Sequence, residues 1–261
     1  MPTRVTPRCS GSRRGGAVLT VGLNRPAKRN ALNDGIILAL RDCFSAIPEE
    51  IGAVVIHGVG DHFSSGLDLS ELTERDATEG LVHSQMWHRV FDRIQYCRVP
   101  VIAALKGAVI GGGLELACAA HIRVAEPSAY FALPEGQRGI FVGGGGSVRL
   151  PRLIGVPRMA DMMLTGRVYS ATEGAAYGFS QYLTEADGAL PKALELAERV
   201  AANAPLTNFA VLQALPMIAE ANPQTGLLME SLMATVAQSD KEAKKRIRAF
   251  LDRKTAKVKP T

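Results

Sequence analysis

The sequence has little cysteine and no cysteine framework. Cysteine occupies four of the 261 positions, and no two of these residues form a C-x-x-C pair. The spacing excludes a zinc ribbon and a small disulfide scaffold, and it fits a reducing cytoplasm, where we expect the protein to work. The four residues are Cys9, Cys43, Cys97 and Cys118.

Long apolar runs without charge are also missing. No such run follows the arginines of the first fourteen residues, so we expect no secretory signal. The most apolar stretch, Val101 to Ala120, contains Lys106, Glu115 and several glycines. A helix crossing a bilayer tolerates these residues poorly, so no membrane span is expected.

Several catalytic motifs are absent as well. The sequence contains no G-x-x-x-x-G-K-[ST], H-E-x-x-H, G-x-S-x-G or G-x-G-x-x-G, so nucleotide hydrolysis, zincin chemistry, a nucleophile elbow and a dinucleotide fold lose their usual support. The five histidines form no i,i+4 pair, so we expect no metal site and interpret each one as a surface or core histidine. They are His57, His62, His83, His88 and His121.

What is present is the balance of an ordinary globular protein, with 47% apolar and 21% charged residues. The length fits one α/β domain, alone or with a smaller helical annex. The net charge of +5 comes from the two ends, since residues 1–14 carry +4 and residues 241–261 carry +7, which leaves −6 for the rest. Basic ends suit a solvated tail, nucleic acid or a phosphate-bearing ligand, and composition alone favours the solvated tail.

Strand-like and helical segments alternate along most of the chain. Alternation of this kind predicts an α/β fold with a largely parallel sheet, followed from Leu190 onward by helices that begin at Pro205 and Pro223. The predicted strands are Ala17–Leu23, Ala53–His57, Val101–Leu105, Ile122–Ala125 and Tyr130–Ala132. The predicted helices are Asp34–Ile47, Leu81–Tyr96, Leu114–Ala120, a stretch from Gly143–Gly146 to Leu153, and Lys241–Lys257.

Three glycine-bearing turns follow strand-like segments, at Ser64–Asp68, Gly111–Glu115 and Gly143–Gly146. Amides at the start of a helix have no intrahelical acceptor and suit a negative oxygen. For each turn on its own, close packing of a helix on a sheet is the preferred explanation. The three together favour an anion or oxyanion site.

Two acidic residues accompany these turns. Glu115 lies in an otherwise apolar helix, where a carboxylate is costly unless it is paired or functional. Glu135 lies between Pro134 and Gly136 in a turn, where the simpler interpretation is a solvated acid. Both are candidates for acid–base chemistry.

Together these segments resemble the crotonase, or enoyl-CoA hydratase/isomerase, superfamily. The resemblance covers about residues 17–261 and includes the order and spacing of its signatures. It implies a spiral of ββα units with a C-terminal helical segment used in trimerisation, and often a hexamer built as a dimer of trimers. The signatures are Asn24–Leu32, Phe63–Leu69, Gly107–Leu116 and Pro134–Gly136.

The resemblance also suggests how the chain is divided. We expect residues 1–14 to be a disordered extension, residues 15–200 to form the spiral core, and residues 201–261 to form the helical oligomerisation segment. The implied assembly is a homotrimer or a hexamer.

For the site, the resemblance implies that the amides of Leu67 and Gly112 form an oxyanion hole. It assigns Glu115 to activating water and Glu135 to protonating the α-carbon, with the Gly143 amide helping to hold the water. Isomerases of the superfamily typically keep one carboxylate, whereas hydration needs one group for water and one for the carbon. Two glutamates therefore favour a hydratase.

The same resemblance places Lys28, Arg29, Ser65 and Asp68 near coenzyme A. Coenzyme A would be part of the substrate, with no separate cofactor and no metal, and neither a membrane nor nucleic acid is expected as a partner. The alternatives are an isomerase, a thioester hydrolase, and an RNA-binding protein that uses the basic ends.

Two departures from the family pattern leave the substrate range open. His121 stands where many members have aspartate, and Val142 replaces a frequent proline. Met86 and Trp87 are candidates for the wall of an acyl pocket, although simple core packing is the preferred interpretation for both.

Overall fold

The computed structural model describes residues 17–71 and 76–252. The chain divides into two compact units, Met1–Ala201 and Ala202–Thr261, each of which is described by itself. The predicted extension at residues 1–14 and the end of the last predicted helix, residues 253–257, lie outside the described residues.

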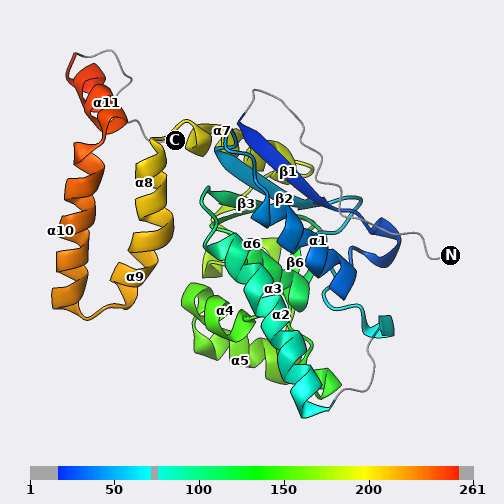
Figure 1. Cartoon of the computed structure of the whole chain (residues 1–261). Coiled ribbons are helices and arrows are strands. Elements are labelled where there is room, and N and C mark those ends of the chain that lie inside the picture. Colours follow the sequence, from blue (N-terminus) through cyan, green and yellow to red (C-terminus); the bar gives the residue numbers. More distant parts are fainter. Residues whose placement is uncertain (1–16, 72–75, 253–261) are drawn as a thin grey trace. The chain divides into compact units, whose positions relative to one another are not determined.

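The first unit contains a five-stranded sheet in which every neighbouring pair is parallel. The strand order is β1-β2-β3-β5-β8, and Figure 1 shows the first three strands side by side. Helix α1 (Asp34–Ser45) connects β1 to β2, and helix α2 (Ala77–Gln95) connects β2 to β3. The strands are β1 (Val18–Leu23), β2 (Ala53–Gly58), β3 (Val101–Leu105), β5 (Ile122–Ala125) and β8 (Tyr182–Leu183).

Both faces of this sheet are buried, which explains the continuous apolar runs in its strands. Val54 and Ile56 pack into a core that includes residues of α1 and α2. Ala53 and Val55 point to the opposite face and pack with residues of α7 (Ala189–Ala201). Alternate residues of β2 therefore pack into two separate cores, one on each face of the sheet.

A smaller sheet follows in the order β4-β6-β7. Strand β4 (Ala108–Ile110) pairs parallel with β6 (Tyr130–Ala132), which pairs antiparallel with β7 (Tyr169–Ser170). The other helices of this unit are α3 (Gly112–Ala119), α4 (Gly146–Ile154), α5 (Val156–Thr165), α6 (Ala171–Tyr177), and the short 3₁₀ helices η1 (Pro26–Lys28), η2 (Leu69–Glu71) and η3 (Gly136–Arg138).

The predicted α/β class with a parallel sheet is confirmed. Strand β3 has the predicted bounds, whereas α2 begins at Ala77 rather than at Leu81. The earlier start has a local cause, because Asp76 and Glu79 form a reciprocal capping box. Strand β4 was not predicted, since it is short and adjoins the glycine turn.

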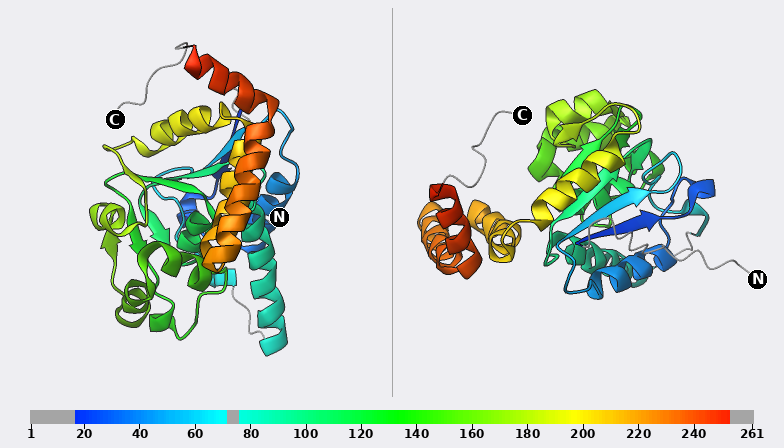
Figure 2. Two further views of the ribbon diagram at one scale, coloured as in Figure 1. Left: turned by 90° about the vertical axis from the view of Figure 1, so that its left-hand side faces the viewer. Right: turned by 90° about the horizontal axis from the view of Figure 1, so that it is seen from above.

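The second unit is helical in the described residues. Helices begin at Pro205 and Pro223 as predicted, and Figure 2 shows α10 running alongside the segment that precedes it, which it contacts. No helix among the described residues is both long and apolar enough to cross a membrane. The elements are α8 (Pro205–Phe209), a π-helical turn η4 (Ala210–Ala214), α9 (Leu215–Glu220), α10 (Pro223–Ser239) and α11 (Lys241–Leu251).

Candidate active site

The amides of Leu67 and Gly112 lie beside each other because the loop before Leu67 pairs with β4. The Ser64 amide donates to the Ala108 carbonyl at 2.9 Å, and the Ile110 amide donates back to the Ser64 carbonyl at 3.1 Å. Gly112 is the first residue of α3, where an amide has no intrahelical acceptor. The structure thus brings together the two amides for which the family resemblance implies an oxyanion hole.

Glycine is required where these two segments meet. Gly66 has φ +85°, and a Cβ there would lie 2.6 Å from the Ile110 carbonyl oxygen and 3.2 Å from the Gly112 nitrogen. A Cβ on Gly112 would lie 2.9 Å from the Trp87 ring and 3.6 Å from the Leu67 nitrogen. A side chain on Gly66 would therefore separate the two amides, and one on Gly112 would displace the Trp87 ring.

Glu115 is held by the glycine loop that precedes α4. Its Oε1 accepts hydrogen bonds from the amides of Gly144 at 2.9 Å and Gly146 at 2.7 Å. Burial raises the pKa of this carboxyl, and the Gly146 and Gly144 amides, the Arg149 charge and the Gly143 amide act in the opposite direction. Burial has the largest effect on this pKa, while the amides favour the ionised form.

Glu135 lies in a different environment, in the turn after β6. A Cβ on Gly111 would lie 2.7 Å from its Oε1, so the carboxyl approaches the backbone just before α3. Its Oε2 is buried and has no hydrogen-bond partner among the described residues. Burial, with the nearby charge of Glu115, raises the pKa of Glu135 to about 7. This carboxyl is therefore suited to hold and release a proton near neutral pH.

Both carboxyls border one cavity of about 490 Å³. The donors Leu67 and Gly112 line the same cavity, as does Gly143. Ser65 also borders it, whereas Lys28, Arg29 and Asp68 do not. The structure thus brings the predicted reacting groups around one space.

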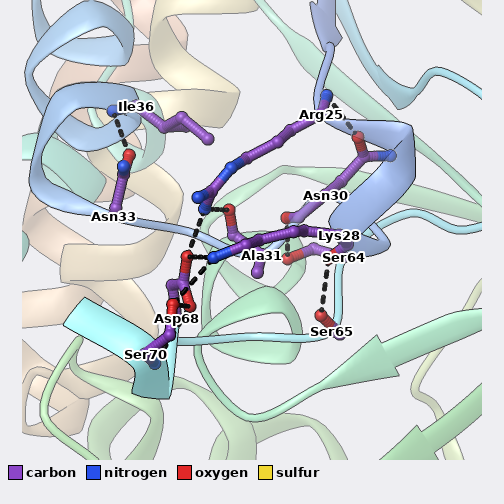
Figure 3. Close-up of polar contacts among 10 residues, drawn as sticks. All are labelled: Arg25, Lys28, Asn30, Ala31, Asn33, Ile36, Ser64, Ser65, Asp68 and Ser70. Carbon is purple, nitrogen blue, oxygen red and sulfur yellow. Dashed lines mark hydrogen bonds and ion pairs between the residues drawn. The ribbon is translucent and has the colours of Figure 1, made fainter. Parts of the chain in front are cut away.

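Of the remaining predicted residues, Lys28, Ser65 and Asp68 are drawn in Figure 3, in a network of polar contacts that joins the segment around Lys28 to the loop at residues 64–68. The Asp68 carboxylate pairs with Arg25 at 2.5 Å and with Lys28 at 3.1 Å. Burial opposes ionisation, but hydrogen bonds from Ser70, Lys28 and Arg25 hold the pKa of Asp68 well below its usual range. The Ser65 amide donates to the Arg29 carbonyl at 2.9 Å. The network fixes the segment carrying Lys28 and Arg29 to the loop carrying Leu67.

Helix α2 supplies the candidate wall residue Trp87 and two further cavity residues, His83 and Ser84, that the sequence did not indicate. His83, Ser84 and Trp87 all border the cavity. His83 Nε2 lies 2.7 Å from Asp34 Oδ1 and 3.3 Å from Trp87 Nε1. The i,i+4 spacing of His83 and Trp87 indicates that they share one face of the helix. The sequence pattern alone does not show which face of the helix borders a cavity.

Core packing was the preferred interpretation for Met86 and Trp87, and in the structure the two residues differ in whether they line the cavity. Trp87 is buried in the core and also forms a cavity wall, whereas Met86 packs against the core and does not line the cavity. His121 also lies away from it. Its Nδ1 accepts from the Val101 amide at 2.9 Å, and its Nε2 lies 2.8 Å from the Gln95 carbonyl oxygen, so it connects α2 to β3. Val142 does line the cavity.

Metal ligation is not supported in the part of the chain that the structure describes, where no group of three or more His, Cys, Asp or Glu side chains is arranged to hold an ion. The polar groups that border the cavity include the two carboxyls and backbone amides, together with the side chains of His83, Ser84 and Arg138.

Comparison with known proteins decides the family. Residues 13–260 match the family described as enoyl-CoA hydratase/isomerase. The chain belongs to the enoyl-CoA hydratase/isomerase family. It is an enzyme of the enoyl-CoA hydratase type, a hydro-lyase acting on an acyl-CoA thioester.

Sequence relatives and solved structures agree with this family assignment. The chain is 35% identical over 246 residues to the 2,3-dehydroadipyl-CoA hydratase of Escherichia coli K12, covering 93% of this chain and 95% of that protein. A crystal structure from Rhodopseudomonas palustris CGA009, designated a candidate enoyl-CoA hydratase, is 84% identical with a TM-score of 0.90, covering 93% of this chain and 94% of that one. The enoyl-CoA hydratase of Bacillus anthracis is 30% identical with a TM-score of 0.86, covering 92% and 94%. The crotonase fold expected from the sequence is confirmed.

Proposed function

We propose that this enoyl-CoA hydratase family member adds water across the 2,3 double bond of an α,β-unsaturated acyl-CoA with Glu115 and Glu135 as its acid–base pair. The observation that carries the proposal is the placement of both carboxyls on one cavity with different hydrogen-bond partners. Glu115 Oε1 accepts two amide hydrogen bonds, whereas Glu135 Oε2 has no partner among the described residues. One group suits a base and the other an acid.

The proposed reaction begins with the thioester oxygen between the amides of Leu67 and Gly112. Glu115 removes a proton from water, and the water oxygen forms a bond to the β-carbon while the double-bond electrons shift toward the thioester oxygen. The two amides stabilise this enolate, and one such donor is worth about 2.7–4 kcal/mol. Glu135 then gives its proton to the α-carbon, and exchange with solvent restores both carboxyls.

Gly143 has the proposed role of holding the attacking water. Its amide is close enough to Glu115 to lower the pKa of that carboxyl, and the residue borders the cavity. Its carbonyl accepts a hydrogen bond from Ser84 Oγ at 2.7 Å, which fixes the peptide that follows it.

Lys28 and Arg29 are proposed to meet the phosphates of coenzyme A, with Ser65 at the cavity rim and Asp68 holding Lys28. Lys28 is half-exposed and lies within the network that orders the oxyanion loop. A phosphate that approaches this surface would meet the Lys28 ammonium, which Asp68 and Ser70 already hold.

The acyl chain is a finer proposal. Ala119–Val124, Tyr130–Phe141, Leu164–Tyr169 and Pro205–Ala210 resemble bacterial methylthioacryloyl-CoA hydratase, which hydrates its substrate and promotes thioester cleavage. A substrate panel should therefore include methylthioacryloyl-CoA, and also 2,3-dehydroadipyl-CoA because of the relative that bears that name.

Assembly and location also remain predictions. We propose a homotrimer or hexamer formed through the C-terminal helices, which light scattering of the full chain would check. A cytoplasmic location is proposed from the cysteine usage, and fractionation would check it. Steep loss of RNA affinity with salt would instead favour the RNA-binding alternative.

The test of the function follows enoyl-thioester absorbance after mixing with a short 2-enoyl-CoA, with the product identified by mass. Addition of one water supports the hydratase, no mass change indicates an isomerase, and free coenzyme A indicates thioester hydrolysis. A Glu115→Gln/Glu135→Gln double variant that hydrates at the parental rate would refute the residue assignment.

A further inference from the structure

The loop that holds Glu115 has a sequence that does not by itself favour one backbone conformation. It consists of four consecutive glycines, Gly143–Gly146. A Cβ on Gly144 would lie 2.9 Å from the Phe91 ring and 3.1 Å from Glu115 Oε2, and one on Gly146 would lie 2.8 Å from Glu115 Cγ. The close approach to Glu115 therefore requires glycine, which has the greatest backbone freedom to lose. Order must come from groups outside the loop.

Arg149 on α4 supplies part of that order. Its guanidinium is buried and donates in three directions: Nη1 to the Gly144 carbonyl at 2.9 Å, Nη2 to Asp92 Oδ1 at 2.6 Å and Nε to Gln95 Oε1 at 2.6 Å. Asp92 and Gln95 both belong to α2. The planar guanidinium therefore fixes the second peptide of the loop relative to α2.

Ser84 fixes the preceding peptide. Its Oγ donates to the Gly143 carbonyl at 2.7 Å, while the Gly144 amide of the same peptide donates to Glu115. In a trans peptide the carbonyl and the amide point in opposite directions, so holding the oxygen aims the N–H at the carboxylate. Ser84 and Arg149 thus donate hydrogen bonds to two successive carbonyls of the loop, and amides of the same loop donate to Glu115.

The charged and titratable groups around the Glu115 carboxyl come from three elements. Cys118 lies on α3 itself, Glu135 follows β6, and Arg149 comes from α4. Helix α2 contributes the apolar ring of Phe91. Of these groups, Arg149 carries the positive charge that favours ionised Glu115.

We propose that Arg149 is a positioning residue that, together with Ser84, orders the Gly143–Gly146 loop so that its amides hold Glu115 ready to activate water. The proposal rests on the proposed hydratase function. Arg149 does not border the cavity, so it acts through the loop rather than on the substrate.

The experiment compares Arg149→Met and Arg149→Lys with Arg152→Met, a control in an exposed arginine of the same helix. Two reactions are followed, namely hydration of a short 2-enoyl-CoA and exchange of the α-protons of a saturated acyl-CoA in D₂O. Exchange needs Glu135 and the oxyanion amides but no activated water. In Arg149→Met we expect kcat for hydration to fall about a hundredfold, the cost typical of a misplaced catalytic group, with KM and exchange nearly unchanged.

Other measurements identify the positioning role. Arg149→Lys keeps the charge but loses the planar fork, so its hydration rate should lie between those of the parent and Arg149→Met. In Arg149→Met the acidic limb of the hydration pH profile should move to higher pH, because Glu115 loses a favourable charge. Arg152→Met should behave as the parent does.

Parental hydration in folded Arg149→Met, or equal loss of hydration and exchange, would overturn the proposal. Should Arg149→Met fail to fold, Asp92→Asn takes its place, with a several-fold loss of hydration expected and unchanged hydration contradicting the proposal. Absence of hydration in the parent would instead overturn the proposed function. In that event ¹³C NMR titration of Glu115 still tests the positioning role. The pKa of Glu115 should be higher in the Arg149 or Asp92 variant than in Arg152→Met. An equal pKa would overturn the proposal.

Discussion

Glu115 and Glu135 border the same cavity, yet their carboxyls are held in opposite ways. Two backbone amides donate to Glu115 Oε1, whereas Glu135 Oε2 is buried and has no partner among the described residues. The charge of Glu115 also raises the pKa of Glu135. The protonation of the two groups is therefore coupled, and ionisation of the first favours the protonated form of the second.

Hydration should decline on the alkaline side of neutrality. The proposed acid Glu135 must carry a proton, and burial raises its pKa to about 7. For the free enzyme, kcat/KM should therefore fall about tenfold for each pH unit above that value. A pH series with a short 2-enoyl-CoA measures this limb, and a profile that stays flat to pH 9 would contradict the role given to Glu135.

Glu135→Gln should stabilise the protein at neutral and alkaline pH. Because the folded-state pKa of about 7 exceeds the reference value of 4.5, the native state binds more protons between these values. The unfolding free energy of the parent therefore falls as pH rises through this range. Glutamine removes this loss, giving a gain on the order of 1–2 kcal/mol above pH 7 after allowance for solvent screening.

Denaturant unfolding at pH 5 and pH 8 measures the gain. Glu198→Gln, an exposed glutamate on α7, provides the matched control, because a surface substitution usually changes stability by less than about 0.5 kcal/mol. If Glu135→Gln shows the same unfolding free energy difference from the parent at both pH values, the buried environment assigned to Glu135 is wrong.

Gly66→Ala should separate the amides of Leu67 and Gly112, the proposed oxyanion hole. The new Cβ would meet the Ile110 carbonyl oxygen at 2.6 Å, so the backbone must move. Losing one such donor costs about 10²–10³-fold in kcat. Gly139→Ala is the control, since Gly139 also has positive φ (+68°) but its Cβ would meet nothing within 4 Å. Similar kcat losses in the two variants would attribute the effect to backbone strain rather than to the clash.

The strands of the large sheet were predictable because their signal is local. Residues such as Val101–Leu105 are apolar throughout, since both faces of a parallel sheet are covered. Strand β4 could not be found in this way. It exists because Ser64 pairs with it on one side and β6 on the other, and both partners are distant in sequence.

The residues that border the cavity and carry the proposed chemistry could be picked out from the sequence to the extent that their residue types are unusual in context. Glu115 stands out in an apolar helix, and glycine turns mark both amides. Arg149 does not stand out, because Arg149 and Arg152 look alike in one amphipathic helix. Only packing shows that Arg149 is buried and Arg152 is not.

The proposed contact with coenzyme A can be tested without altering the reacting groups. Lys28→Met should raise KM for a coenzyme A thioester about fivefold, because a partly exposed charge pair contributes roughly 1 kcal/mol to binding. The effect should shrink with added salt. The same acyl group on pantetheine lacks the nucleotide phosphates, so its KM should not change. Arg41→Met, an exposed arginine on α1, is the control and should leave both KM values at those of the parent. Because Lys28 also pairs with Asp68, loss of loop order is the competing explanation, and it would lower kcat for both substrates alike.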